Sequence, residues 1–366
     1  MSSQDEGSSW NVTNSSNGTT LKIQARGKVE FTDDDLDVKS LSSGGWVVIE
    51  RRVGGIGGFI GGDVKRFEAR EGGGTIARKY VIDGREVGAA EGRQWLATFL
   101  PEMLREMAVN ADRRVARQIA SGGPSLVLDE IGRTKSGFAK SRYLRELYKQ
   151  ASLDQALLTR SLHQAAREIE SDFELGQVLK AAAERQAIDQ AMPAFMDAAR
   201  SVESDFEQRQ VLSKALARPG LTAETAGALF KAATPGQGDT GIDSDFELRQ
   251  LLGTAARGGH VTDANVAVFI AAARAIGSDF ERGRVVQALA LAKLSDAAMA
   301  EIVGLAADIG SDFERSRAIV GLSRNQPIGA ATKKALASAA MGISSDFERG
   351  RALSALTRAG VLTAAQ

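Results

Sequence analysis

The chain of 366 residues contains no cysteine and only two histidines, His163 and His260. Without thiols it can form no disulfide bond, thiolate metal site or cysteine nucleophile. A catalytic zinc ion needs about three protein ligands, so the histidines would have to be joined by carboxylates. Neither histidine lies in a His-Glu-x-x-His motif. We therefore expect polar surface roles for both, and no metal and no cofactor.

Signatures of enzymes are also missing. The sequence contains no G-x-S-x-G elbow, no set of kinase motifs and no Walker loop. We therefore predict a chain that is not an enzyme. One alternative stays open, namely a perturbed carboxylate in a deep pocket between the N-terminal region and the first helical units, which would indicate an active site.

Excess charge of one sign and long apolar runs are absent as well. Lys and Arg together number 46, as do Asp and Glu, so the formal net charge is zero. Bulk electrostatics thus give no reason to expect DNA, RNA or an anionic membrane as the main partner. Charged residues interrupt every apolar stretch well short of a membrane span. We expect a soluble chain with no membrane span.

What the sequence does contain is one tetrad, Ser-Asp-Phe-Glu, in six copies. The copies begin at Ser171, Ser204, Ser244, Ser278, Ser311 and Ser345, so successive starts are 33, 40, 34, 33 and 34 residues apart. A period of this size is typical of stacked structural repeats. The surplus of the 40-residue step falls in residues 233–241, which we expect to form a loop.

Helix capping explains why the tetrad recurs. A serine at the N-cap accepts a hydrogen bond from the amide three residues later, and a glutamate at that position reaches back to the serine amide. The aspartate adds negative charge at the positive end of the helix dipole. The predicted capping pairs are Ser171 with Glu174, Ser204 with Glu207, Ser244 with Glu247, Ser278 with Glu281, Ser311 with Glu314 and Ser345 with Glu348. Catalytic acid–base pairs would have no reason to recur in every unit.

Apolar spacing around each tetrad predicts two antiparallel helices per unit. Ala318, Ile319 and Leu322 keep helical spacing after Ser311, and we expect Phe313 to join their apolar stripe. A branched apolar residue precedes every serine by two positions, and we expect it to be buried. These residues are Ile169, Val202, Ile242, Ile276, Ile309 and Ile343. Such small pairs of helices must stack into a solenoid to bury their apolar faces.

The rest of the chain differs in pattern. We predict a disordered tail over residues 1–18, a small antiparallel β domain over 19–90, connecting and capping helices over 91–135, and an α-solenoid of about seven repeats over 136–366. The seventh repeat is the degenerate copy that begins at Ser136. The fold class is thus α+β, mostly α. We expect Trp95 and Phe99 to dock the β domain onto the first helices.

Two segments of the β domain have compositions that also occur in phosphate-binding and calcium-binding sites. The glycine-rich residues 54–62 resemble a phosphate loop, but a strand-like segment follows where a helix is needed, so a hairpin tip is favoured. The acidic residues 32–37 could bind calcium, but they lack the spacing of an EF-hand loop. We therefore favour an acidic turn between two strands.

Arginines recur beside the tetrads. Three successive repeats carry them at equivalent positions, as Arg282 and Arg284, Arg315 and Arg317, and Arg349 and Arg351. Stacking would align them into a ridge that could bind carboxylates or phosphates, although pairing with acids of adjacent repeats is favoured. A second basic segment runs from Arg133 to Lys149 and could face an anionic partner, with a solvated helix face as the favoured alternative.

The Ile-x-Ser-Asp-Phe-Glu units resemble HEAT-like helical repeats of bacterial envelope proteins, including extensions of beta-lactam-sensor-type membrane metallopeptidase regulators. The resemblance covers about residues 136–366. It implies an envelope or periplasmic location, whereas a native start at Met1 would imply the cytoplasm. The metallopeptidase motif is absent, so the resemblance implies no catalytic residue.

We therefore expect a non-enzymatic scaffold that binds another protein, as a sensor or adaptor. Two alternatives stay open. One is a regulatory domain of a membrane metallopeptidase or signalling protein, and the other is a HEAT-like nucleic-acid-binding protein, which the balanced charge disfavours.

Overall fold

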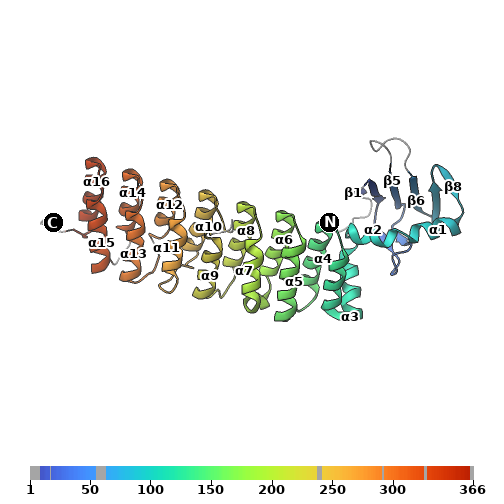
Figure 1. Ribbon diagram of the computed structural model, residues 1–366, viewed down its shortest axis with the longest axis horizontal. Helices are drawn as coiled ribbons and strands as arrows, with labels where there is room; N and C mark the ends of the chain where they lie inside the picture. Colours follow the sequence, from blue (N-terminus) through green and yellow to red (C-terminus); the bar gives the residue numbers. More distant parts are fainter. Residues whose placement is uncertain are drawn as a thin grey trace. The chain divides into compact units, whose positions relative to one another are not determined.

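A computed structural model describes residues 9–16, 18–54, 63–236, 241–290, 292–324 and 328–362. The chain forms two compact units, residues 1–147 and 148–366. The division falls inside helix α4 (Gly137–Gln150). The fold class is α+β and mostly α, with an antiparallel sheet followed by consecutive helices (Figure 1).

The first unit is built on a six-stranded antiparallel sheet in the order β1-β2-β5-β6-β7-β8. These strands are β1 (Ser9–Ser16), β2 (Thr19–Arg26), β5 (Trp46–Val53), β6 (Asp63–Gly72), β7 (Thr75–Ile82) and β8 (Arg85–Val87). A separate hairpin of β3 (Val29–Phe31) and β4 (Val38–Leu41) lies between β2 and β5 in the chain. Two-residue connections join β1 to β2, β6 to β7 and β7 to β8, whereas the β3–β4 hairpin separates β2 from β5.

Strand β1 corrects the predicted tail. Residues 9–16 pair along their whole length with β2. Composition alone suggested disorder because Ser, Asn and Thr bury little apolar surface. The edge of β2 nevertheless offers unpaired amides and carbonyls, and Trp10 and Val12 pack against the core of the sheet.

One face of the sheet is closed by two short helices, α1 (Ala89–Ala97) and α2 (Leu100–Glu106). Ile23, Ile49 and Phe67 are fully buried beneath them. Trp95 and Phe99 lie in the same core with ring centroids 4.7 Å apart, so the expected docking role is confirmed. Pro101 lies in the first turn of α2, where proline costs no hydrogen bond.

Helix α3 (Ala111–Arg133) and the first part of α4 complete this unit. Helix α3 is kinked at Gly123, which has φ 73° and ψ −177° and precedes Pro124. A residue before proline avoids the helical region, and glycine adopts positive φ without strain.

The second unit is a helical-repeat solenoid (Figure 1). One row consists of α6 (Asp172–Ala183), α8 (Asp205–Leu216), α10 (Asp245–Arg257), α12 (Asp279–Ala288), α14 (Asp312–Leu322) and α16 (Asp346–Arg358). The other consists of α5 (Gln155–Glu168), α7 (Met192–Arg200), α9 (Ala223–Ala233), α11 (Val266–Arg274), α13 (Asp296–Ala307) and α15 (Ala330–Met341), with a 3₁₀ turn at Gln186–Ala191. Within each row every helix packs on the next.

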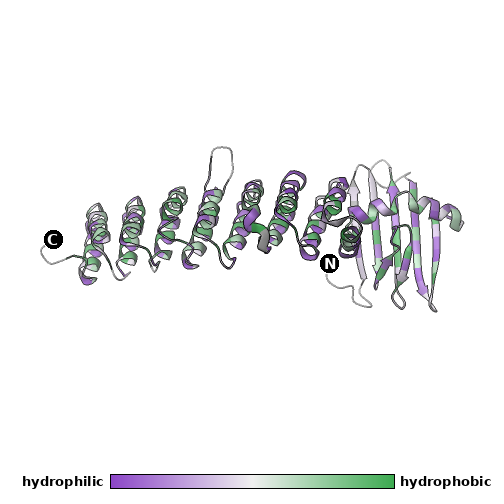
Figure 2. Cartoon of the chain, turned by 90° about the horizontal axis from the view of Figure 1, so that it is seen from below, coloured by the Kyte–Doolittle hydropathy of each residue, from purple (hydrophilic) through white to green (hydrophobic). Residues whose placement is uncertain are grey.

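The core of the solenoid follows the apolar pattern. All six branched residues that precede the serines are buried, as predicted, and so are Ala318, Ile319 and Leu322. Figure 2 shows that each repeat helix carries both hydrophobic and hydrophilic residues. The solenoid is therefore held together by amphipathic helices, as its period requires.

The prediction that the tetrad phenylalanines join this core is wrong. Phe313 is 49% exposed. With 3.6 residues per turn, its position lies about half a turn around the helix from Ala318, Ile319 and Leu322. The ring therefore points away from the stripe.

Among the described residues, no helix combines the length and the apolar character needed to cross a membrane.

Candidate functional site

The six tetrad serines are the N-cap residues of the α6 row. Each has an extended backbone, and its Oγ accepts a hydrogen bond from the tetrad glutamate amide at 3.3 or 3.4 Å. This satisfies one of the amides that a helix start leaves unpaired. Ser136 caps α4 in the same way, through the Ala139 amide at 3.2 Å.

The other half of the predicted capping box is replaced by a contact between repeats. The serine amide donates to the aspartate of the preceding tetrad, at 2.8 Å in each case. The pairs are Ser204 with Asp172, Ser244 with Asp205, Ser278 with Asp245, Ser311 with Asp279 and Ser345 with Asp312. The second carboxylate oxygen accepts from the amide just before the serine, at 2.8 to 3.2 Å. We call this contact the aspartate clamp.

Sequence reasoning did not predict the aspartate clamp, because a favourable interaction with the helix dipole already explained why each tetrad contains an aspartate. The sequence did hold a hint, since all six tetrads have aspartate at this position, although glutamate would interact with the dipole equally well. The same device occurs in the first unit, where the Glu106 carboxylate accepts from the amides of Lys135 and Ser136 at 2.8 to 3.1 Å. In the other row of the solenoid, Asp296 accepts from Ala331 and Thr332, and these bonds lower the pKa of Asp296.

Tetrad glutamates, freed from the serine amide, pair with cations instead. Lys180 donates to Glu207 at 3.1 Å, and Arg249 donates to Glu281 at 2.7 Å. In both pairs the cation belongs to the preceding repeat. Glu314 pairs within its own helix, with Arg317 at 3.2 Å. The acids along this edge are therefore largely neutralised.

The predicted arginine ridge divides into two sets with different contacts. Arg282, Arg315 and Arg349 donate to the carbonyls of Ile276, Ile309 and Ile343, which precede their own helices. Two of them also reach the next repeat, Arg282 at the Asp308 carbonyl, 3.1 Å away, and Arg315 at the Gly342 carbonyl, 2.8 Å away. These three arginines bind main-chain oxygens, and Arg349 also pairs with Asp346 in its own helix.

The other three, Arg284, Arg317 and Arg351, lie against phenylalanine rings. The Arg284 guanidinium is 5.4 Å from the Phe280 centroid, and Arg317 is 5.5 Å from that of Phe313. Arg351, from the next repeat, is 5.8 Å from the same Phe313 ring. Guanidinium groups at this distance are attracted to the ring faces. Arg351 thus connects two successive repeats at the surface.

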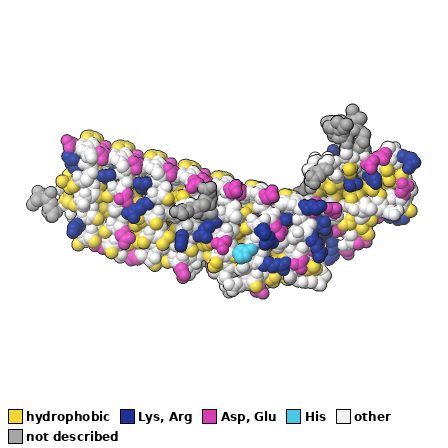
Figure 3. Space-filling view, viewed as in Figure 1, with side chains coloured by type: hydrophobic (Ala, Val, Ile, Leu, Met, Phe, Trp, Pro, Cys, Tyr) yellow, Lys and Arg dark blue, Asp and Glu magenta, His cyan; other side chains and the backbone are white. Residues whose placement is uncertain are grey.

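The tetrad phenylalanines form the feature that we call the phenylalanine ridge. Its members and their exposed fractions are Phe173 56%, Phe206 50%, Phe246 49%, Phe280 48%, Phe313 49% and Phe347 78%. All lie at the same position of helices that pack in sequence. Figure 3 shows hydrophobic and acidic side chains recurring together along one edge of the repeats. Large apolar side chains in a regular exposed row are a mark of an interaction surface.

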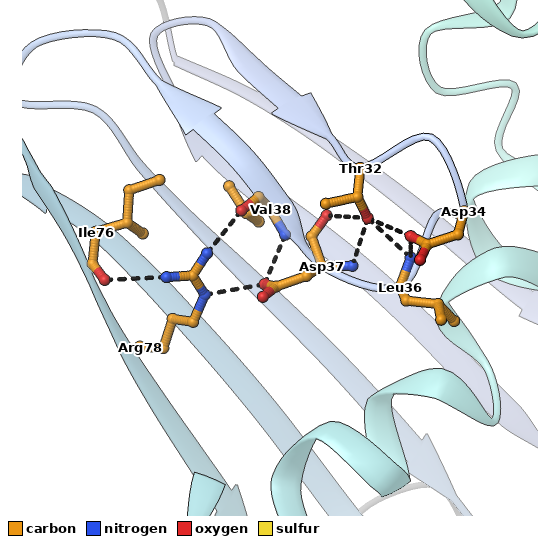
Figure 4. A network of polar contacts seen from close by, with 7 residues as sticks. All are labelled: Thr32, Asp34, Leu36, Asp37, Val38, Ile76 and Arg78. Atoms are coloured by element: carbon orange, nitrogen blue, oxygen red, sulfur yellow. Dashed lines mark hydrogen bonds and ion pairs between the residues drawn. The ribbon is translucent and has the colours of Figure 1, made fainter. Parts of the chain in front are cut away.

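The acidic segment 32–37 is the turn between β3 and β4 (Figure 4). Asp34 accepts from the Thr32 hydroxyl at 2.6 Å, and these local bonds lower the pKa of Asp34. Asp37 accepts from Arg78 at 3.0 Å, and Asp35 pairs with Arg114 at 2.7 Å. Each of these carboxylates is thus held by a protein donor, which favours the structural turn.

A cavity of about 640 Å³ opens in the first unit beside Arg51, Phe99 and Glu102. Glu106 also lines it, but its carboxylate is bound to two backbone amides. Glu102 pairs with Lys135 at 3.3 Å. The acids of this cavity have structural partners, and the geometry supplies no acid–base pair.

The remaining candidates do not form a site in the described parts of the chain. His163 is exposed, His260 is half-buried, and no cluster of three or more potential metal ligands occurs among the described residues. In the basic segment, Lys140 is buried, and Arg133 pairs with Glu130. That segment is therefore no open cationic patch.

Two predicted loops lie partly outside the described residues. Of the glycine-rich segment, residues 55–62 are not described, but β6 rather than a helix follows it. Of the insertion at 233–241, residues 237–240 are not described. The rows on both sides continue, since α8 packs on α10 and α9 packs on α11.

Comparison with known proteins identifies no relative. No protein-family model, no curated protein and no solved structure matches this chain.

Proposed function

We propose that this chain is a non-enzymatic scaffold that binds a partner protein along the phenylalanine ridge. The exposed row of six phenylalanines is the observation that carries the proposal. Burying the exposed half of one such ring contributes about 1 kcal/mol. Six rings engaged together contribute about 6 kcal/mol, which is similar to the lower estimates of the cost of association, so further contacts along the ridge have to supply the surplus.

The repeat architecture supports the same function. Solenoids present long, regular surfaces because each unit repeats the same side chains at a fixed step. The ridge lies on helices whose positions are fixed by the aspartate clamps, so its rings are held in register before any partner arrives. Such preorganisation lowers the entropic cost of binding. Together with the resemblance to envelope repeats, it favours a sensor or adaptor at the bacterial envelope.

Nucleic acid is a weaker candidate for the same surface. The tetrad acids and the cations beside them nearly balance one another, because five tetrad aspartates accept from backbone amides and Glu207, Glu281 and Glu314 pair with cations. Nucleic acid carries a phosphate on every nucleotide and draws most of its affinity from an excess of cations, which this balanced ridge does not offer.

Panning a random peptide library on the full chain tests the proposal. Counter-selection uses a variant in which Phe206, Phe246, Phe280 and Phe313 are alanine. We expect enriched peptides that bind the native chain at least tenfold more tightly than the variant. Enrichment of no ridge-dependent peptide would contradict the proposal.

A further inference from the structure

We propose that the phenylalanine ridge binds an extended polyproline II segment of the partner that carries carboxylates between its prolines. This inference rests on the proposed function and specifies the chemistry of the partner. It combines the spacing of the ridge with the placement of its arginines.

The spacing of the rings favours this conformation. Neighbouring packed helices lie about 8–10 Å apart, so equivalent side chains along the row repeat at that distance. A polyproline II helix rises about 3.1 Å per residue with three residues per turn, which returns every third side chain to the same face after about 9.3 Å. An extended β-strand alternates faces, so residues three apart point in opposite directions. Polyproline II therefore presents one residue to each ring along the row.

The chemistry of the rings fits proline. Flat aromatic surfaces are the usual receptors for proline-rich segments, which lose little entropy on binding because they are already extended. Phe280 and Phe313 remain about half exposed even with arginines against them. Each ring thus keeps a free surface for a pyrrolidine ring.

The arginines of the ridge are the reason to expect carboxylates in the partner segment. Arg284 and Arg351 are exposed at the ridge, and Arg317 lies between them along the row. A guanidinium has five N–H donors, and the surface pairs that Arg317 and Arg351 make with Glu314 and Glu348 use few of them. Asp279 and Asp312 are occupied by backbone amides of the next repeat. The remaining N–H donors of Arg284, Arg317 and Arg351 therefore favour a partner segment that carries carboxylates.

The length of the bound segment follows from the row. Six rings separated by five steps of about 9 Å span about 45 Å, which corresponds to about 15 residues of polyproline II. The synthetic peptide (Pro-Pro-Glu)₆ is long enough to reach every ring and serves as the probe. The flexible peptide (Gly-Ser-Glu)₆ has the same length and charge, and (Pro-Pro-Lys)₆ has the opposite charge.

Fluorescence anisotropy with the full chain measures binding of the three labelled peptides. We expect (Pro-Pro-Glu)₆ to bind at least tenfold more tightly than either control. The variant with alanine at Phe206, Phe246, Phe280 and Phe313 should lose at least tenfold in affinity. Met341→Ala and Val268→Ala remove exposed apolar side chains outside the ridge and should leave the affinity unchanged. Circular dichroism establishes that each variant is folded.

A second set of variants tests the charge. Replacing Arg284, Arg317 and Arg351 with glutamine should weaken binding of (Pro-Pro-Glu)₆ at least threefold and flatten its dependence on salt, because exposed charges are screened by ions. Binding that survives both sets of substitutions would overturn the inference, and so would equal affinity for (Gly-Ser-Glu)₆.

Library panning separates this inference from the proposed function. Ridge-dependent peptides without prolines or acids would refute the polyproline segment while leaving the scaffold in place. Ridge-dependent binding of oligothymidylate with a steep loss of affinity in salt would refute both proposals.

Discussion

The core phenylalanine of the first unit and the tetrad phenylalanines of the solenoid lie in opposite environments. In the first unit Phe67 is fully buried between the sheet and its helices, with its ring 5.1 Å from that of Tyr80. In the solenoid, the phenylalanine of every tetrad is about half exposed or more. The solenoid core does hold other phenylalanines, since Phe195, Phe230 and Phe269 of the second row of helices are fully buried. The comparison shows that large aromatic rings at the solenoid edge do not serve the core.

Carboxylates are held in two ways in this chain, by cationic side chains or by backbone amides, and the examples below take one way from each unit. In the first unit, Glu30 and Asp35 pair with the arginines Arg113 and Arg114. In the solenoid the tetrad aspartates bind backbone amides of the next repeat. Side-chain pairs depend on two residues, whereas the clamp depends on one residue and the backbone.

The largest effect is expected from removing one phenylalanine in each unit. Phe67→Ala should lower the free energy of unfolding of the first unit by about 3–5 kcal/mol, because it leaves a cavity. Phe313→Ala should cost the solenoid about 1 kcal/mol or less, since half of the ring is already in water. All three tryptophans lie in the first unit, so their fluorescence in a urea titration reports on it, and circular dichroism reports on the helices. Equal losses would contradict the comparison.

The clamp can be tested with two aspartates at the same tetrad position. Asp279→Ala removes the acceptor of the Gly310 and Ser311 amides and should destabilise the solenoid by about 2 kcal/mol. No described repeat follows Asp346, whose side chain is 90% exposed, so Asp346→Ala is the matched control, with a loss of about 0.5 kcal/mol or less. Urea midpoints by circular dichroism measure both. A similar loss in the two variants would show that the inter-repeat bonds contribute little.

The two sets of arginines give a finer comparison within one helix. Arg282→Met removes donors to the Ile276 and Asp308 carbonyls and should destabilise the solenoid by about 1–2 kcal/mol. Arg284→Met removes a surface contact with Phe280 and should cost about 0.5 kcal/mol, the value of an exposed cation–π pair. Thermal unfolding of both variants provides the measurement, and a larger loss for Arg284 would reverse the assignment of structural and surface roles.

The smallest effect concerns pH in the first unit. The hydrogen bond from Arg113 lowers the pKa of Glu30 from 4.5 to about 2. A lowered carboxyl pKa means that this stabilisation is complete above pH 4.5 and is lost as the pH falls from 4.5 to about 2. Glu30→Gln should therefore reduce stability by less than about 1 kcal/mol at pH 7, because the Arg113 side chain is about half exposed. Tryptophan-monitored unfolding at pH 7 and pH 2 should show this difference shrinking, and a constant difference would exclude the pair as its source.

The sequence predicted the solenoid well because its period and apolar spacing are properties of single residues at fixed steps. Ile309 and Leu322 are buried as expected. The sequence did not predict strand β1, because this strand is stabilised by backbone pairing with β2. Amino-acid composition carries no information on such pairing. The kink at Gly123 follows from the local backbone preferences of glycine and of the residue before proline.

The candidate surface was predicted less completely. The sequence shows that arginine and phenylalanine recur at the positions of Arg284 and Phe280, but whether they are exposed depends on their angular position around the helix. Measuring that position from the apolar stripe would have placed Phe280 on the exposed face. The partner of Asp279 could not be identified, because a backbone amide has no sequence signature.

The aspartate clamp has a consequence for how this chain could change in length. The residues whose amides precede the serine amides are Glu203, Asp243, Gly277, Gly310 and Ser344, so acidic, hydroxyl and absent side chains all occur there. The clamp binds main-chain donors and is therefore compatible with these different side chains. Excising residues 278–310, one whole period, would present the amides of Ser311 and its new neighbour Gly277 to Asp245. Modules of this kind are interchangeable, so gene duplication or deletion can lengthen or shorten the array without redesigning a junction.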